Sequence, residues 1–345
     1  MRTSRLIGAL AAAALALGLA ACAPAPVPAE TPAGSGSPAS AAADGFPVTI
    51  EHVFGQTVIQ KKPERIASVA WANHEVPLAL GVVPVGMAKV SWGDDDKDGV
   101  LPWVEDKLTE LGAATPVLFD ETDGIDYEAV SDTKPDVILA SYSGLTKEEY
   151  DTLSKIAPVV AYPKNAWGTS VEDMITLNST AIGLADEGAK LIEDLHAQTA
   201  AALEANSALQ GKKVLFAYID PNDFSQVGFY TALDTRPGFL TSIGLPLPSI
   251  VEQNAASTDF YLTVSAEKAD DLNDVDLIVT YGDDDSTIAT LQADPLLSKI
   301  PAIAEGRVVI LVNDTPLAAS ANPSPLSIPW GIGDYLALLA APLSK

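Results

Sequence analysis

The chain has 345 residues, of which 46 are Asp or Glu and 20 are Lys or Arg, so its formal net charge at pH 7 is -26. This charge argues against nucleic acids and anionic membrane surfaces as partners, because both attract clustered Lys and Arg. The single cysteine excludes an internal disulfide and a zinc site built from several cysteines.

The N-terminus has the features of an export signal. Arg2 and Arg5 precede an unbroken apolar stretch over residues 6–19, and small residues follow it. The segment Leu19-Ala20-Ala21-Cys22 resembles the lipobox of bacterial lipoproteins, in which the cysteine is acylated once the preceding peptide is removed. We therefore expect residues 1–21 to be a signal peptide and Cys22 to anchor an extracytoplasmic protein to the outer face of the cell membrane. The alternative is an incidental thiol.

Residues 22–45 are predicted to form the lipidated cysteine and a disordered tether. They are almost wholly Ala, Pro, Ser, Gly, Thr and Val, a composition that cannot bury enough apolar surface to offset the entropy lost on ordering. The body that follows, about 300 residues long, exceeds what one compact core usually holds, so two lobes are expected.

The body begins with a predicted hairpin, with strands over residues 48–54 and 56–59 flanking Gly55. Short apolar strands then alternate with helical stretches, which indicates a mainly parallel sheet covered by helices. The expected strands are 65–70, 83–88, 136–140 and 159–161, and the expected helices lie near 75–80, from 102 onward and near 147–154.

A different pattern follows the first set of strands. Residues 185–206 are rich in Ala, Leu, Glu and Lys without proline, and about 20 helical residues cover about 30 Å, enough to join two lobes. A second set begins after Gly211, with strands at 213–218, 277–280 and 307–311 and a closing helix at 329–339. The predicted fold is α/β: two lobes, residues 46–166 and 210–345, each a mainly parallel sheet flanked by helices, joined through residues 167–209 by a long rigid helix.

Five segments, in order along the chain, resemble the recurring segments of helix-linked (class III) periplasmic binding proteins for siderophores, haem and cobalamin. They are Phe46-Pro47-Val48-Thr49-Ile50, Lys62-Pro63-Glu64-Arg65-Ile66, Ala79-Leu80-Gly81-Val82-Val83-Pro84-Val85-Gly86, Lys134-Pro135-Asp136-Val137-Ile138-Leu139-Ala140 and Ala304-Glu305-Gly306-Arg307-Val308-Val309. The resemblance covers essentially the whole mature chain. It implies a non-enzymatic protein that captures a ferric siderophore and delivers it to an ABC-type permease.

Aromatic residues recur just after the expected strands. In open α/β sheets, ligands bind beyond the carboxyl ends of the strands, and aromatic rings suit a bulky organic ligand. Arg236 would make forked hydrogen bonds to a carboxylate, hydroxamate or catecholate oxygen. The alternatives are rings that cap the core under loops and an Arg236 ion pair with a neighbouring aspartate. The expected ligand-binding residues are Trp71, Trp92, Tyr142, Trp167, Tyr218, Tyr230, Arg236 and Tyr281.

The family resemblance also implies permease docking through one glutamate on each lobe. Glu128 and Glu267 match those positions, each at the first turn of a predicted helix. A carboxylate there also compensates the helix dipole, which is the alternative role.

An acidic loop matches the calcium-loop pattern, with Asp94, Asp96 and Asp98 at positions 1, 3 and 5, Gly99 at position 6 and Glu105 at position 12. The pattern makes this loop a candidate site for a structural calcium ion. The alternative is a solvated acidic loop, because the preceding segment is predicted as strand rather than helix.

Catalytic and cofactor patterns are sparse. The three histidines are scattered along the sequence, and no phosphate loop, nucleophile elbow or dinucleotide fingerprint follows a strand, so no cofactor is required. Arg236 and Lys89 would suit an anionic chelate, whereas the acidic surface tolerates a neutral or cationic hydroxamate chelate. A hydroxamate is the cargo that we prefer. Cobalamin or haem as cargo, and an exported hydrolase or lyase, are the alternatives. We expect a monomer.

Overall fold

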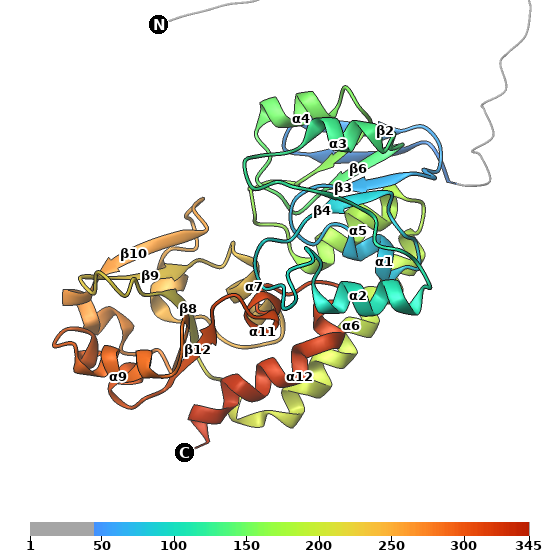
Figure 1. The fold of residues 1–345 in the computed structure, drawn as a ribbon. Helices are drawn as coiled ribbons and strands as arrows, with labels where there is room; N and C mark the ends of the chain where they lie inside the picture. Colours follow the sequence, from blue (N-terminus) through green and yellow to red (C-terminus); the bar gives the residue numbers. More distant parts are fainter. Residues whose placement is uncertain (1–44, 345) are drawn as a thin grey trace, which may run out of the picture. The chain divides into compact units, whose positions relative to one another are not determined.

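The computed structural model describes residues 45–344 (Figure 1). The predicted signal peptide, the predicted lipidation site Cys22 and all but the last residue of the predicted tether lie outside this range. Among the described residues, no helix combines the length and apolar character needed to cross a membrane.

The first lobe contains the predicted hairpin and a five-stranded parallel sheet. Strands β1 (Val48–His52) and β2 (Gly55–Ile59) pair antiparallel, with Val48 opposite Ile59. The sheet has the order β5-β4-β3-β6-β7, and β3, β4, β6 and β7 are buried at every position, as expected for strands covered on both faces. Its strands are β3 (Ile66–Ser68), β4 (Gly86–Ala88), β5 (Val117–Phe119), β6 (Val137–Ala140) and β7 (Val159–Ala161).

The second lobe contains a mixed five-stranded sheet in the order β10-β9-β8-β11-β12. Strands β8, β11 and β12 are parallel, as predicted, whereas β9 pairs antiparallel with both β8 and β10. Gly228 in β9 lets a neighbouring ring approach, because a Cβ there would lie 1.7 Å from the Tyr261 hydroxyl oxygen. The strands are β8 (Val214–Tyr218), β9 (Gln226–Tyr230), β10 (Tyr261–Ser265), β11 (Leu277–Gly282) and β12 (Val308–Val312).

Helices cover both sheets (Figure 1). Those around the first sheet are α1 (Glu75–Ala79), α2 (Pro102–Glu110), α3 (Tyr127–Asp132), α4 (Lys147–Leu153) and α5 (Val171–Ala181). Those of the second half are α7 (Thr235–Ser242), α8 (Ser249–Gln253), α9 (Ser286–Ala293), α10 (Pro301–Ala304), α11 (Pro316–Ser320) and α12 (Ser327–Ala340). Short 3-10 segments occupy Ser207–Leu209, Ala266–Leu272, Leu297–Lys299 and Ala341–Leu343.

The predicted linking helix is α6 (Ala185–Ala205), 21 residues long, which runs beside α12 (Figure 1). Leu191 and Ile192 pack with a cluster that contains first-lobe residues such as Tyr142. Ala202 and Leu203, about three turns further on, pack against the core of the second lobe. The same helix therefore contacts both cores.

The two lobes also share apolar contacts. Ala319 and Leu326 of the second lobe belong to the cluster that contains Leu101 and Trp103 of the first lobe. Ile328 of α12 belongs to a further cluster with Tyr142 and α5 residues. Apolar packing therefore crosses the boundary between the lobes in both of these clusters.

Candidate ligand-binding cleft

Residues that follow the strands of both sheets meet at the boundary between the lobes. The Trp92 ring, after β4, lies edge-on to Tyr281 of β11, with ring centroids 5.6 Å apart. The Tyr142 hydroxyl, after β6, lies 3.2 Å from the Thr235 hydroxyl of α7. The carboxyl ends of the two sheets therefore face a common region, where open α/β sheets bind ligands.

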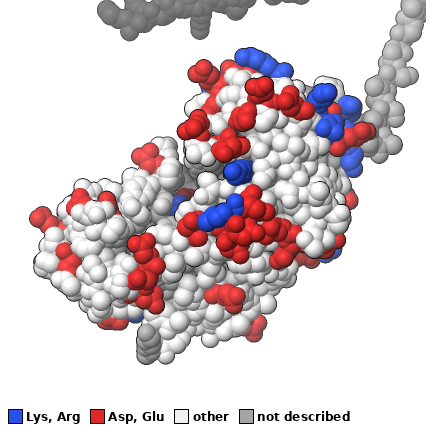
Figure 2. Space-filling view, in the orientation of Figure 1, with Lys and Arg blue, Asp and Glu red and all other residues white. Residues whose placement is uncertain are grey.

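Two hollows lie beyond the carboxyl ends of the strands, one in each lobe, and each has a volume of about 190 Å³. The first-lobe pocket is lined by Trp71, His74, Lys89, Leu101, Glu121 and Trp167, among others. The second-lobe pocket is lined by Tyr218, Pro221, Phe224, Tyr281, Asp283 and Asn313, among others. In Figure 2, acidic side chains lie on both lobes beside the hollow between them, and basic side chains also lie at its edge.

Trp71 reaches the first-lobe pocket on a strained turn. Ala70 and Ala72, on either side of it, have φ angles of 60° and 61°, in the left-handed region that non-glycine residues rarely adopt. Such backbone strain persists only where the surrounding contacts hold it in place. The position of the Trp71 ring is therefore set by its neighbours rather than by local preference.

Asn73 holds two loops of this region together through hydrogen bonds, a role that was not predicted from the sequence. The side chain is fully buried, and its amide group donates to the carbonyl oxygens of Val69 and Tyr142, both at 2.9 Å. Its oxygen accepts from the Tyr142 backbone N–H at 3.1 Å and from the Asn178 amide at 3.2 Å. Asn73 thus joins the loop after β3, which carries Trp71, to the loop after β6.

Trp167 lies on the other wall of the first-lobe pocket. Its ring stands edge-on to Tyr142 with centroids 5.4 Å apart. It packs directly over the backbone of Gly144, where an added Cβ would lie 2.3 Å from the indole nitrogen. Only glycine leaves room for the ring in this place.

Tyr142 is buried and bridges the lobes. Its hydroxyl group contacts Thr235 at 3.2 Å and accepts from the Asn322 amide at 3.1 Å. Burial raises the pKa of the Tyr142 hydroxyl above its ordinary value. The hydroxyl is therefore neutral at physiological pH, and in this arrangement it connects the lobes.

Arg236 is paired with its own neighbour and enclosed by rings. Burial lowers its pKa, but the hydrogen bonds and charge of Asp234 raise it by more, so the net shift is upward. Two guanidinium nitrogens each lie 2.7 Å from an Asp234 carboxylate oxygen. The guanidinium stacks 3.7 Å from the Tyr230 ring centroid and also donates to the Tyr281 hydroxyl at 3.3 Å. The alternative of an ion pair with a neighbouring aspartate is confirmed, and the contact of Arg236 with a ligand stays a prediction.

The three predicted tyrosines of the second lobe occupy different settings. Tyr218 is 41% exposed and shares the second-lobe pocket with Tyr281. Tyr230 lies edge-on to Phe216 at 5.7 Å, beneath Arg236. The structure therefore groups Trp71 with Trp167, and Trp92 with Tyr281, Tyr230 and Arg236, while Tyr218 lies at the exposed rim. Their role in binding a ligand stays a prediction.

Glu121 was missed by the sequence analysis. It follows the edge strand β5, lines the first-lobe pocket, and both of its carboxylate oxygens accept from the Ala70 N–H, at 3.2 and 3.0 Å. Burial raises the pKa of the Glu121 carboxyl to about 7, and the charge of Glu149 adds to the shift. The signal was present, since Val117-Leu118-Phe119 is a short apolar run followed by Asp120 and Glu121.

The two predicted docking glutamates are exposed. Glu128 lies in the first turn of α3, but the side chain that caps this helix is Asp126, which accepts from the Ala129 N–H at 2.9 Å. Glu267 lies in a 3-10 segment capped by Ser265. Neither glutamate serves as the cap, and the docking role stays a prediction.

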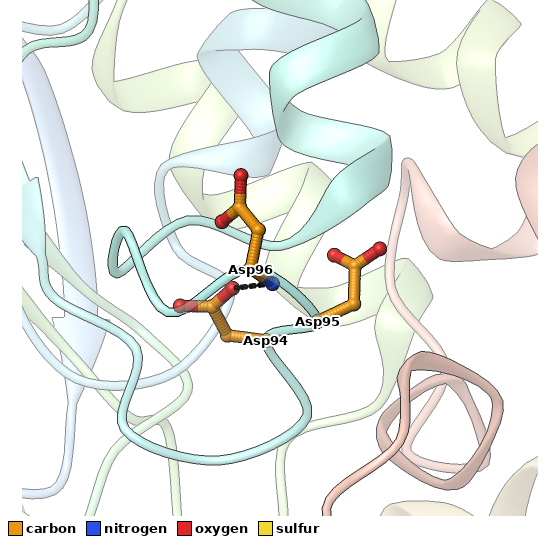
Figure 3. A group of neighbouring side chains, drawn as sticks. All are labelled: Asp94, Asp95 and Asp96. Carbon is orange, nitrogen blue, oxygen red and sulfur yellow. Dashed lines mark hydrogen bonds between the residues drawn. The ribbon is translucent and has the colours of Figure 1, made fainter.

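The acidic loop is tightly turned (Figure 3). The Asp94 carboxylate accepts from the backbone N–H groups of Asp96 at 3.2 Å, Lys97 at 2.9 Å and Gly99 at 2.7 Å. The carboxylates of Asp96, Asp98 and Glu105 converge within 4.8 Å of one another, and Asp94 belongs to a neighbouring group with Asp95 and Asp96. Burial, and then the charges of Asp98 and Asp96, raise the pKa of Glu105. Three of the four predicted ligands therefore face one point, and the calcium site stays a prediction.

The histidines play separate structural parts. His52 is buried, with its ring nitrogen 2.9 Å from the Thr57 hydroxyl. His196 is an exposed residue of α6, and its Nε2 atom lies 3.0 Å from a carboxylate oxygen of Glu172 on α5. His74 is buried beside the first-lobe pocket, and desolvation lowers its pKa to about 4.

The sequence and the fold of this chain are similar to those of known binding proteins. A family model described as "Periplasmic binding protein" matches residues 66–315. The structure of PiaA from Streptococcus pneumoniae TIGR4 in complex with ferrichrome is 48% identical, with a TM-score of 0.82 over 86% of this chain and 98% of that chain. A periplasmic solute binding protein from Mycobacterium smegmatis is 27% identical, with a TM-score of 0.68 over 86% and 98% of the two chains. The iron(3+)-hydroxamate-binding protein YxeB of Bacillus subtilis is 24% identical over 261 residues, which cover 74% of this chain and 75% of the relative.

Proposed function

Because the chain belongs to the periplasmic binding protein family, we propose that it captures a ferric hydroxamate siderophore outside the cytoplasm and delivers it to an ABC-type permease. The observation that carries the proposal is the meeting of strand-end rings from both lobes. Trp92 of the first lobe lies edge-on to Tyr281 of the second. Trp71 and Trp167 line the hollow of the first lobe, and Tyr218 and Tyr281 line that of the second. Such rings supply broad apolar contact for the organic shell of a chelate whose iron is already fully ligated.

The charges at the cleft support a neutral or cationic chelate over an anionic one. Arg236 is paired with Asp234 at 2.7 Å, and the Lys89 amine lies 3.8 Å from Asp120. Glu121 adds a carboxylate to the same region. Three hydroxamates balance the charge of Fe³⁺, so a ferric trihydroxamate enters without needing a countercharge from the protein, whereas an anionic chelate would meet unfavourable desolvation. The named relatives that bind ferrichrome or ferric hydroxamate are in line with this choice.

The rest of the function follows the same premise. Cys22 anchors the chain by its lipid to the outer face of the cell membrane, and Glu128 and Glu267 contact the permease, one from each lobe. The protein binds its cargo without transforming it, because the cleft residues supply contact and charge rather than a nucleophile with its base. A monomer suffices for this role.

Titration of the purified mature protein with iron-loaded chelates tests the proposal. A ferric trihydroxamate should quench tryptophan fluorescence and appear as a one-to-one complex in native mass spectrometry. A ferric tricatecholate and ferric citrate should bind at least about tenfold more weakly, as expected for a charge left without a partner. Haemin and cobalamin serve as further probes. Binding of none of the iron chelates, or release of a cleaved chelate, would contradict the proposal.

A further inference from the structure

The Glu121 carboxylate has acceptor capacity that the protein leaves unused. Its two oxygens share a single donor, the Ala70 N–H, at 3.2 and 3.0 Å. An ionised carboxylate offers about four acceptor sites, and this one lines the first-lobe pocket. Most of its hydrogen-bonding capacity therefore faces the hollow rather than the protein.

The charged groups around Glu121 do not balance it. Lys89 lines the same pocket, but its amine is 3.8 Å from Asp120, and none of the ion pairs found within residues 45–344 includes Glu121. Glu149 contributes a like charge. His74, on the pocket wall, has its pKa lowered to about 4 by burial and is neutral at pH 7. Because no cation within residues 45–344 pairs with Glu121, a cationic group on a ligand would be its first partner of opposite charge.

The imbalance has an energetic consequence. A carboxylate that is mostly desolvated and lacks a cation holds its proton more tightly, and the pKa of Glu121 rises to about 7. A ligand ammonium within hydrogen-bonding distance would restore the ionised form and make a charge-assisted hydrogen bond. A cationic donor in this pocket would therefore bind more tightly than a neutral group of the same shape, whereas an anion would be repelled by the ionised carboxylate.

The size and walls of the pocket define which part of a ligand enters it. Its volume of about 190 Å³ is below the roughly 300–1,000 Å³ of sites that hold a whole drug-sized ligand. An arm of the chelate fits, not the iron centre. Trp71, Trp167 and Leu101 form apolar walls, which suit a methylene stem, and indole rings also attract an ammonium group.

We propose that Glu121 is a specificity-determining residue that accepts hydrogen bonds from a protonated amine on an arm of the bound ferric hydroxamate. The inference rests on the proposed function and narrows it to chelates that carry a cationic arm. The Ala70 N–H keeps the carboxylate in place beside Trp71 while its remaining acceptor sites meet the ligand.

A matched pair of probes tests this proposal: a linear ferric trihydroxamate that ends in a primary amine, and the same chelate with that amine acetylated. The iron centre is identical, so only the charge of the arm differs. At pH 8 the wild-type protein should bind the amine form about tenfold more tightly, equivalent to about 1.4 kcal/mol. Glu121→Gln keeps an acceptor for Ala70 but removes the charge, and should bring the ratio of the two affinities close to one. Glu148→Gln, which neutralises an exposed glutamate of the same lobe outside the pocket lining, should behave like the wild type.

Two measurements need no variant. The wild-type preference for the amine form should shrink as the pH falls from 8 to 6, because Glu121 becomes protonated. Calorimetry at pH 7 in buffers of different ionisation enthalpy should show proton release of about half an equivalent for the amine form only, since a group near its pKa is half protonated.

The outcomes separate the inference from the function. Equal wild-type affinity for both chelates overturns the inference and leaves the proposed function standing. Equal weakening of both chelates by Glu121→Gln also overturns it, because Glu121 would then act only by holding the Ala70 turn. If neither chelate binds the wild type, the proposed function itself fails.

Discussion

The Glu75 carboxylate of the first lobe accepts a hydrogen bond from the Ser324 hydroxyl of the second lobe. The side chain is fully buried, and it also accepts from the Leu326 N–H at 3.0 Å and from the Trp103 indole at 2.9 Å. Leu326 immediately precedes α12, whose first N–H groups carry partial positive charge. One lobe thus supplies the N-terminal cap for the last long helix of the other.

This cap predicts how stability depends on pH. Burial raises the pKa of Glu75 to about 7 despite its hydrogen bonds, whereas a carboxyl of the unfolded chain titrates near 4.3. The folded state therefore binds the proton more tightly, and the free energy of unfolding falls as pH rises from about 4.5 to about 7. Between pH 5 and pH 8 the Glu75 contribution should amount to about 2 kcal/mol, measured by urea unfolding.

Glu75→Gln isolates that contribution, because it cannot ionise. Glu121, with its pKa raised to about 7, acts in the same direction, and His74, with its pKa lowered to about 4, acts in the opposite direction between about pH 4 and 6.5. Both remain in the variant, so the difference between the two proteins reports Glu75 alone. Parallel pH profiles would show that Glu75 does not titrate in this window.

Removal of a cleft tryptophan should weaken binding without unfolding the protein. Trp71→Ala and Trp167→Ala each delete a wall of the first-lobe pocket, and each should lower the affinity for a ferric trihydroxamate by about tenfold or more, in line with aromatic residues at interface centres. The matched control is Trp330→Ala, since Trp330 is 38% exposed on α12 and packs on Trp103. Fluorescence titration measures all three, and equal affinities would rule out the first-lobe pocket as part of the site.

Gly144 offers a subtler change to the same pocket. In Gly144→Ala the new methyl group would lie 2.3 Å from the Trp167 indole nitrogen, so the ring must move. We expect weaker ligand binding and a shifted tryptophan emission spectrum, with modest loss of stability. Gly333→Ala adds the same methyl group to α12 where nothing lies within 4 Å, and should leave affinity unchanged while stabilising the helix by up to about 1 kcal/mol.

Calcium should stabilise the protein if the acidic loop binds it, because a cation relieves the repulsion among Asp96, Asp98 and Glu105. At a calcium concentration of 100 times Kd the gain is about 2.7 kcal/mol, visible as a rise in melting temperature. Glu105→Gln should abolish the rise, and Asp106→Asn, the next residue on α2, should preserve it. Identical melting curves with calcium and with a chelator would contradict the calcium site and favour the alternative of a solvated acidic loop.

Docking predicts a separation between binding and transport. Glu128→Ala with Glu267→Ala should reduce permease-dependent iron uptake by about tenfold, the scale expected when charge pairs at an interface are removed, and leave chelate affinity unchanged. Glu148→Ala, at another exposed position of the first lobe, provides the control. Normal uptake by the double variant would exclude these two glutamates as contacts.

The sequence predicted those elements whose pattern is local. β7 occupies Val159–Ala161 and α2 begins at Pro102, as expected, because an apolar run and a proline at the first helical position are signals carried by adjacent residues. β5, β9 and β10 were missed. β5 is an apolar run of only three residues at the sheet edge, β9 is interrupted by Gly228, and β10 is only partly buried, so none shows a long apolar run.

The candidate site divides in the same way. The rule that ligands lie beyond strand ends was enough to select Trp71 and Trp167, which line one pocket. The pairing of Arg236 with Asp234 was foreseen only as an alternative, because two residues so close in sequence can also point apart. Asn73 bonds to Tyr142, which is distant in sequence, and Glu121 follows β5, a strand that was not predicted, and bonds to the equally distant Ala70. Only the tertiary structure shows these contacts.

The shared apolar interior has a consequence for how the molecule is divided. Leu101 and Trp103 pack with Leu326, and Ile175 packs with Ile328, so a cut between the lobes would leave large hydrophobic faces open to water on both fragments. We therefore expect that neither lobe folds stably without the other, and that residues 45–344 unfold on heating in one cooperative step. A chimera that takes one lobe from a relative should fold only if the residues packed between the lobes, such as Leu101, Trp103, Leu326 and Ile328, are matched to that lobe.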